Sequence, residues 1–270
     1  MYTFDSNQPY TMPTCATFRD PRPWEAGGMR YGRVTSMTVS FLSDTAAVAR
    51  CLPEPFRPAD EPVVSVTFQK CEDVDWLAGR GYHLVGIDAA AIFDGQRDRD
   101  VHGNYCIVMW EDMCEPIIGG REHSGVPKIF GDVDFIQTDA DAYECKLSRF
   151  SHQFMAMSVT QLQTLDDAAC RDIEQTRRDS VWMNYKCIPR LENDGSDVSY
   201  ATVYPSSGQV VEARSGKGSI EFMHATFKQV PTQHNAINLL ADLPVREVRP
   251  SNVIHWKEVR AIDRLPRRLQ

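Results

Sequence analysis

The chain has 270 residues and a formal net charge of −8, with 42% apolar and 24% charged residues, which is typical of a soluble globular protein. The acidic balance, with no Lys/Arg run longer than two residues, disfavours nucleic acid and anionic membranes as partners. No apolar run approaches transmembrane length, and the first residues lack the basic and apolar regions of a signal peptide, so we expect a cytoplasmic protein.

The eight cysteines form no C-x-x-C pair, and several fall within apolar runs. This pattern is typical of reduced core thiols rather than structural disulfides. No H-E-x-x-H motif or cluster of His and Cys occurs, so we expect no bound metal.

The first thirty residues differ from the rest of the chain. They contain four prolines, Trp24 and the pair Gly27-Gly28, which predict an irregular arm rather than a helix or strands. Residues 31–270 show no internal repeat and no low-complexity linker, so we expect them to form a single domain.

The elements predicted after the arm are mostly strands. A strand over 32–42 precedes a short helix over 45–51, which Asp44 should cap and Pro53 should end. Ten further strands are predicted at 62–68, 80–93, 103–110, 132–137, 143–147, 154–159, 181–188, 198–204, 209–212 and 218–222.

Four other segments complete the prediction. Asp112 should cap a short helix that has Pro116 in its first turns and ends at Gly125 and Pro127. Residues 166–178 have helical spacing of their apolar residues. Residues 230–243 form a crossing segment, and 253–262 close the chain as a strand or short helix. Many strands at short spacing with few helices favour an α+β class that is mainly antiparallel β, built as a barrel or sandwich.

The segment from Glu115 to Gly131 reads EPIIGGREHSGVPKIFG and contains a lysine among apolar residues. The immediate neighbours of Lys128 are Val126, Pro127, Ile129 and Phe130. Apolar surroundings favour the free amine over the ammonium, and a free amine attacks ketones to form a Schiff base. The alternative from the residues alone is that Lys128 extends its ammonium to solvent.

This segment resembles the active-site segment of the acetoacetate decarboxylase superfamily. That family combines Glu-Pro, Gly-Arg-Glu and Pro-Lys, which stand here at 115–116, 120–122 and 127–128. Residues 44–55 (DTAAVARCLPEP), 60–62 (DEP) and 243–247 (LPVRE) resemble further family blocks in the same order. The resemblance spans roughly residues 30 to 260.

The resemblance implies a conical antiparallel β-barrel with short peripheral helices and Lys128 inside it. It further implies imine formation on Lys128 without a cofactor, a small oxo acid as substrate, and assembly into a homo-oligomer.

Several positions depart from the decarboxylase pattern. A second lysine that follows the first in the decarboxylases is Ile129 here. Two pocket glutamates of the family align with Thr67 and Leu84. An arginine of the family's first strand aligns with Val34, and with a small shift Arg33 or Arg30 could take its place. These departures favour the superfamily branch that acts on pyruvate-like 2-oxo acids by aldol condensation, dehydration or hydration.

Candidate site residues follow from these arguments. Tyr82 shares a strand face with Leu84 and is a candidate proton donor or acceptor, with a role in the core as the alternative. Arg121 and Glu122 are candidates for carboxylate binding and proton transfer, or they form a structural ion pair. The catalytic candidates are Lys128, Tyr82 and Glu122, and the substrate-binding candidates are Arg121, His123, Ser124, Arg33 and Trp256.

Three functions remain open at this point. The first is a Schiff-base lyase acting on a 2-oxo acid, and the second is a true β-keto-acid decarboxylase. The third is a barrel that has lost catalysis and binds a small ligand. Trapping with borohydride separates an enzyme from a binder, and release of carbon dioxide separates the two enzymes.

Overall fold

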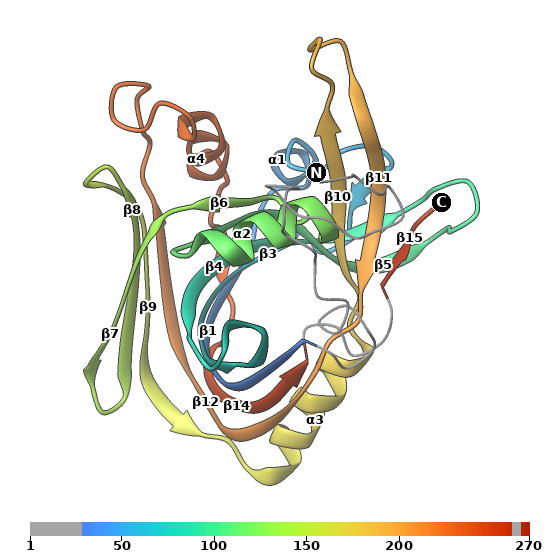
Figure 1. Cartoon of the computed structure of the whole chain (residues 1–270). Coiled ribbons are helices and arrows are strands. Elements are labelled where there is room, and N and C mark those ends of the chain that lie inside the picture. Colours follow the sequence, from blue (N-terminus) through green and yellow to red (C-terminus); the bar gives the residue numbers. More distant parts are fainter. Residues whose placement is uncertain (1–28, 261–265) are drawn as a thin grey trace, which may run out of the picture.

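The computed structural model describes residues 29–260 and 266–270, and strands dominate them (Figure 1). The expected arm therefore lies, apart from residues 29 and 30, outside the described residues. The strands are β1 Arg30–Leu42, β2 Phe56–Pro58, β3 Val63–Val74, β4 Tyr82–Phe93, β5 Val101–Glu111, β6 Lys128–Phe130, β7 Asp132–Asp139, β8 Ala142–Arg149, β9 His152–Thr164, β10 Trp182–Pro189, β11 Ser196–Tyr204, β12 Ser207–Phe222, β13 Glu247–Val248, β14 Ser251–Arg260 and β15 Arg267–Arg268. The helices are α1 Thr45–Ala49, α2 Cys114–Gly119, α3 Asp167–Asp179 and α4 His234–Ala241, with shorter helical turns η2 Asp75–Leu77 and η3 Gly120–Ser124.

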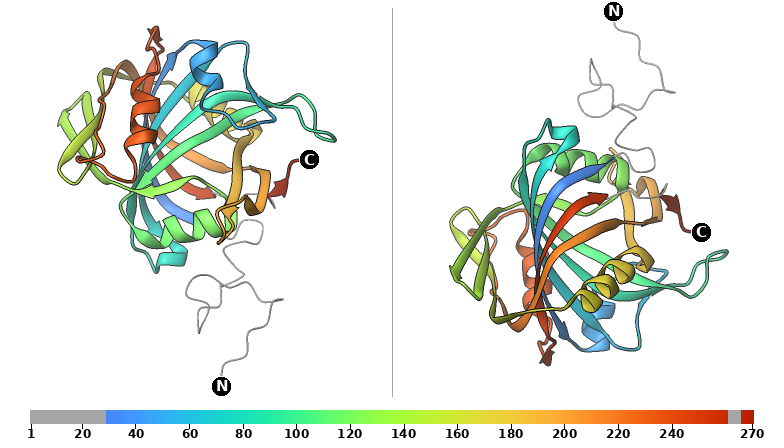
Figure 2. Two further views of the ribbon diagram at one scale, coloured as in Figure 1. Left: turned by 90° about the horizontal axis from the view of Figure 1, so that it is seen from above. Right: turned by 90° about the horizontal axis from the view of Figure 1, so that it is seen from below.

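These strands form one 15-stranded sheet in the order β15-β11-β10-β5-β4-β3-β1-β14-β12-β9-β8-β7, with β13, β2 and β6 attached to β1, β4 and β5. Among the described residues, every strand pairing is antiparallel except β5 with β6 and β5 with β10. The sheet curls into a barrel-like wall around a central space, with α2 on one side and α3 on another (Figures 1 and 2). This confirms a mainly antiparallel fold with few short helices, although in the described part of the chain the end strands β15 and β7 do not pair with each other.

Strand alternation divides the buried residues between two sides of the sheet. On one side Met37, Val39 and Phe41 of β1 join a large core that also receives α1 and α4. On the other side Tyr31 and Val34 belong to a second cluster, which surrounds the central space. Fully burying one such aromatic or aliphatic side chain stabilises the fold by about 1.5–3 kcal/mol.

The sequence-based boundaries needed four corrections. Asp44 does occupy the N-cap of α1, but its carboxylate makes no cap bond and instead accepts two hydrogen bonds from Arg246 at 2.7 and 2.9 Å. Met113, not Asp112, precedes α2. The strands expected at 209–212 and 218–222 are one continuous strand, β12, whose register shifts three times.

The fourth correction matters most for the site. The strand expected to end at Trp110 continues by one residue to Glu111. In addition, the crossing segment over 230–243 contains helix α4, and the last long segment is strand β14. No helix in the described ranges is long and apolar enough to cross a bilayer.

Candidate active site

The concave side of the sheet encloses a cavity of about 850 Å³. Alternate residues of β1, β3 and β4 line it, as expected for strands whose successive side chains point to opposite faces. From these strands they are Val34, Ser36, Thr38, Thr67, Gln69, Cys71, Tyr82, Leu84, Gly86 and Asp88. The positions aligned with the family's pocket arginine and glutamates, namely Val34, Thr67 and Leu84, are therefore all at the cavity wall.

Lys128 begins β6 and projects into this cavity. Its backbone lies beside Met109 in the parallel pairing with β5. The side chain is 12% exposed, and its Nζ lies 2.7 Å from Oε1 of Glu111. The same Nζ donates a hydrogen bond to the carbonyl oxygen of Pro116 at 3.1 Å. The amine is thus held inside the protein and pointed at the cavity, as the resemblance implies.

Glu111 is the acid that sequence reasoning missed. It is fully buried, and burial raises the pKa of its carboxyl, although the neighbouring Lys128 opposes that shift. Its Oε2 has no hydrogen-bond partner among the described residues. A carboxyl in this position is able to take the proton from the amine and return it during a reaction.

The turn that carries the Gly-Arg-Glu motif explains how the lysine is accommodated. Pro116, Gly120 and Ser124 are spaced four residues apart on consecutive helical turns and all line the cavity, because such residues share a face. A side chain at Gly120 would place its Cβ 2.5 Å from Cε and 2.9 Å from Nζ of Lys128. Glycine is therefore required at 120 by the close approach of the lysine.

The same helical geometry turns the charged and imidazole side chains between Gly120 and Ser124 away from the cavity. Arg121, Glu122 and His123 do not line the described cavity. Arg121 is exposed, and its Nη1 donates to the carbonyl oxygen of Lys128 at 3.0 Å. The carbonyl oxygen of His123 accepts from Nζ of Lys186 at 3.2 Å. Of the four adjacent candidates in this motif, the structure brings only Ser124 to the cavity, where its carbonyl accepts from Tyr204 Oη at 3.0 Å.

Tyr82 lies at the cavity wall as expected and faces a second tyrosine. The hydroxyls of Tyr31 and Tyr82 are 3.2 Å apart and buried. Burial raises the pKa of both phenols above the ordinary value near 10. The pair therefore stays protonated at neutral pH and is able to donate hydrogen bonds toward the cavity.

Trp256 also lines the cavity, from strand β14, and its Nε1 donates to Oγ of Ser36 at 2.9 Å. Its ring is covered by the guanidinium of Arg177, which lies 4.9 Å from the ring centroid. Arg177 comes from helix α3, which was predicted as a helix but not as a source of site residues.

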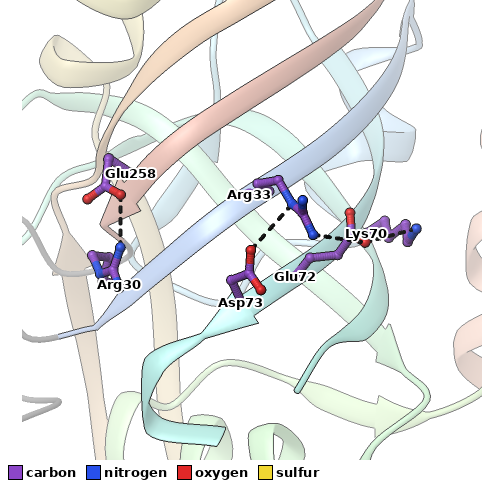
Figure 3. Close-up of polar contacts among 6 residues, drawn as sticks. All are labelled: Arg30, Arg33, Lys70, Glu72, Asp73 and Glu258. Atoms are coloured by element: carbon purple, nitrogen blue, oxygen red, sulfur yellow. Dashed lines mark hydrogen bonds and ion pairs between the residues drawn. The ribbon is translucent and has the colours of Figure 1, made fainter. Parts of the chain in front are cut away.

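Arg33, by contrast, lies outside the cavity. Its side chain is 64% exposed and pairs with Asp73 at 3.4 Å and with Glu72 at 3.8 Å. Figure 3 shows these contacts, together with those of Lys70 to Glu72 and of Arg30 to Glu258. Arg33 and Val34 are neighbours, so when Val34 lines the cavity Arg33 points to the opposite face.

Asp88 is a second acid that sequence reasoning missed. It lines the cavity from β4, and its Oδ1 accepts a hydrogen bond from Nε1 of Trp182 at 3.0 Å. Burial raises the pKa of its carboxyl to about 6, although the hydrogen bonds from Trp182 and Cys106 oppose the shift.

Strand alternation contained the signal for both acids. Glu111 stands two residues after Met109, and Asp88 stands four after Leu84, so each shares the cavity face of its own strand. Glu111 was missed because the predicted strand ended at Trp110, one residue too early. Arg177 had no comparable signal, because charged residues on a surface helix ordinarily face solvent.

Comparison with known proteins agrees with the resemblance seen in the sequence motifs. A family model described as acetoacetate decarboxylase matches residues 11–259. The acetoacetate decarboxylase of Chromobacterium violaceum is 31% identical over 122 residues, which are 45% of this chain and 44% of that protein. Decarboxylase DEC1 of Cochliobolus heterostrophus is 24% identical over 118 residues, 44% of each chain. The matched segments therefore span less than half the length of these curated relatives.

Solved structures extend the likeness of fold to nearly the whole chain. A structure from studies of acetoacetate decarboxylase has a TM-score of 0.72 at 20% identity and covers 96% of this chain and 94% of the other. The enduracididine biosynthesis enzyme MppR, complexed with the condensation product of pyruvate and imidazole 4-carboxaldehyde, has a TM-score of 0.69 at 16% identity, covering 96% and 95%. At these identities the likeness establishes the fold.

Proposed function

Because the chain belongs to the acetoacetate decarboxylase family, we propose that it is a lyase in which Lys128 forms a Schiff base with a small 2-oxo acid. The observation that carries the proposal is the enclosed amine of Lys128, 2.7 Å from the buried carboxyl of Glu111 and open to the cavity. No cofactor is needed for this chemistry, since the iminium nitrogen itself accepts the electrons.

The proposed reaction begins when the free amine attacks the carbonyl carbon of the substrate. Glu111 takes the proton that the ammonium must lose, and the carbonyl oxygen leaves as water when the imine forms. Loss of a proton next to the iminium gives an enamine, whose carbon attacks an aldehyde in a condensation. Tyr82, whose hydroxyl stays protonated, is placed to donate to the oxygen that becomes negative.

The choice of the aldol, dehydration or hydration branch rests on the cavity wall. Thr67 and Leu84 stand where the decarboxylases are expected to carry glutamates, and both line the cavity. MppR, which shares the fold, has been solved with pyruvate and with a condensation product of pyruvate. A cavity of about 850 Å³ leaves room for two reactants of this size.

A second candidate function is decarboxylation of a β-keto acid. Glu111 favours it, because a buried acid beside the lysine partly restores the acidic groups absent at Thr67 and Leu84. The two candidates are separated by supplying acetoacetate and measuring carbon dioxide. Slow release, far below the ordinary enzymatic range of about 1–1,000 per second, is expected for the leading proposal, and turnover within that range would favour decarboxylation.

Location, partners and assembly are proposed as well. We propose a cytoplasmic protein that acts on a free small molecule, with no nucleic acid or membrane partner. We also propose a homo-oligomer, and sedimentation at micromolar concentration tests it. A single species of 30.6 kDa would contradict assembly. A catalytically inactive binding barrel is the third possibility, and failure to trap any adduct would favour it.

A further inference from the structure

The cavity contains a second basic residue whose charge is not balanced in the described part of the chain. Lys128 and Arg177 are the two basic side chains among the described residues that line it. Lys128 has the carboxyl of Glu111 at 2.7 Å. No carboxylate of the described residues lies within 4 Å of the Arg177 guanidinium, and its buried Nε has no hydrogen-bond partner there.

The described residues around Arg177 do not supply an anion for it. Glu174, one turn earlier on α3, already accepts a hydrogen bond from the backbone N–H of Val210 at 2.6 Å. Burial lowers the pKa of Arg177 to about 10, with Cys71 acting in the opposite sense, so the guanidinium remains charged at neutral pH. Charged groups enclosed by protein are ordinarily paired, because loss of hydration is costly.

The position of Arg177 also suits a ligand that reaches Lys128. In the sheet order β5-β4-β3-β1-β14, Lys128 pairs beside β5, and Arg177 covers Trp256 on β14. Cys71 on β3 lies midway in this order. Burial raises the pKa of its thiol, and the charges of Lys128 and Arg177 both oppose that rise. Lys128 on β6 and Arg177 on α3 thus both border the cavity, and Figure 1 shows β6 and α3 on different sides of the central space.

We propose that Arg177, supported by the indole of Trp256, binds the carboxylate of the oxo acid whose carbonyl is attacked by Lys128. This inference rests on the proposed function. It assigns carboxylate binding to Arg177, which was not among the site candidates derived from the sequence. The planar guanidinium offers paired N–H donors to a carboxylate, and the tryptophan face stabilises the cation before the ligand arrives. Arg177 is therefore a specificity residue that selects acids over neutral ketones.

The test compares two carbonyl compounds that differ in the carboxylate. Pyruvate and pyruvamide both offer a ketone to Lys128, but only pyruvate offers an anion. Imine formation is trapped with cyanoborohydride over a concentration series in the wild type, Arg177→Met, Arg177→Lys and the adjacent Arg178→Met. Methionine keeps an apolar stem over Trp256, and residue 178 is an exposed arginine on the same helix.

The expected result is a rise of at least about tenfold in the half-saturating concentration of pyruvate in Arg177→Met, a change that corresponds to about 1.4 kcal/mol. The value for pyruvamide stays within about twofold, Arg177→Lys recovers part of the loss, and Arg178→Met behaves as the wild type. An equal loss for both compounds would assign Arg177 a structural role and overturn the inference. Unchanged values for pyruvate would also overturn it.

A binding measurement separates this inference from the proposed reaction. Lactate has the carboxylate of pyruvate but no carbonyl, so it is able to occupy the subsite without forming an imine. Saturation-transfer NMR is expected to detect lactate on the wild type and not on Arg177→Met. If the wild type traps no carbonyl compound but still shows this difference, the proposed lyase function fails while the carboxylate subsite stands. If lactate binds both proteins equally, the subsite is wrong.

Discussion

Glu111 and Lys128 form a buried pair, 2.7 Å apart, on neighbouring parallel strands. The pair joins a lysine whose sequence neighbours are apolar to an acid that is fully buried. Since Glu111 ends β5 and Lys128 begins β6, the geometry of the pair is fixed by the pairing of these two strands rather than by a flexible loop.

Replacing Glu111 with glutamine should slow imine formation at neutral pH by about 10²–10⁴-fold, because a positioned general base contributes that much. The glutamine keeps the shape of the side chain but cannot take the proton from the amine. Rates of trapping with pyruvate and cyanoborohydride measure the effect. Glu72→Gln, on the outer face of the sheet beside Arg33, serves as the control and should react as the wild type. Equal rates in Glu111→Gln and the wild type would remove Glu111 from the mechanism.

Gly120→Ala should lower the rate of imine trapping by about 100-fold while the fold is kept. The added Cβ would stand 2.5 Å from Cε of Lys128, so the amine must shift, and a displacement near 1 Å costs about that factor. Gly119→Ala is the matched control, since nothing lies within 4 Å of a Cβ there. Trapping rates and circular dichroism of the two variants provide the test. Normal trapping in Gly120→Ala would mean that the lysine does not react from the position described here.

Asp88 should make the stability of the protein depend on pH. Its carboxyl has a pKa raised from 3.8 to about 6 by burial, so the folded state prefers the protonated form. The resulting stabilisation is fully present below pH 3.8 and is lost as the pH rises through about 6. The interval corresponds to at most roughly 3 kcal/mol. Asp88→Asn should remove this dependence and unfold no more easily than the wild type at pH 8.

Urea unfolding of Asp88→Asn and the wild type between pH 4 and 8 measures the difference. The exposed Asp172→Asn on α3 is the control and should follow the wild type. The prediction for Asp88 is wrong if the wild type and Asp88→Asn lose stability in parallel across this range.

The rate of imine formation at Lys128 should depend more on the exclusion of water than on the nearby cation Arg121. Val126 lines the cavity and is 3% exposed, whereas Ile129 packs against the other core, so Val126 is the position to change. Val126→Asn should admit water to the surroundings of the amine and slow trapping at pH 7 by about tenfold. Arg121→Gln should leave the rate unchanged, because Arg121 is exposed and contacts only the backbone of Lys128 among the described residues.

Val126→Ala separates polarity from lost packing in this experiment, since it opens space without adding a polar group. If trapping slows only in Arg121→Gln, charge rather than desolvation controls the amine.

The sequence predicted those parts of the fold and site that depend on local pattern. Alternation in β4 correctly put Tyr82 and Leu84 on one face, and the alignment placed Val34 and Thr67 at the same cavity. Arg33 was wrongly expected at the site. It lies next to Val34, and neighbouring residues of a strand point in opposite directions.

The rest depended on geometry that a single sequence does not contain. The segment with the Gly-Arg-Glu motif was expected to form a short helix, and it does fold as helical turns. Its polar residues Arg121, Glu122, His123 and Ser124 were nevertheless all treated as site candidates. In such a turn only residues about four apart share a face, so Gly120 and Ser124 reach the cavity and Arg121 to His123 do not. Arg177 approaches Trp256 through the packing of α3 on β12 and β14, a long-range contact that no motif announces.

The location of the covalent adduct shows directly whether Lys128 is the nucleophile. The protein is incubated with pyruvate, reduced with cyanoborohydride and digested, and the modified peptide is identified by mass spectrometry. The account predicts one dominant adduct on Lys128, which is absent from Lys128→Ala although that variant folds normally. An adduct spread over exposed lysines, or one equally abundant in Lys128→Ala, would contradict the assignment of Lys128 as the nucleophile.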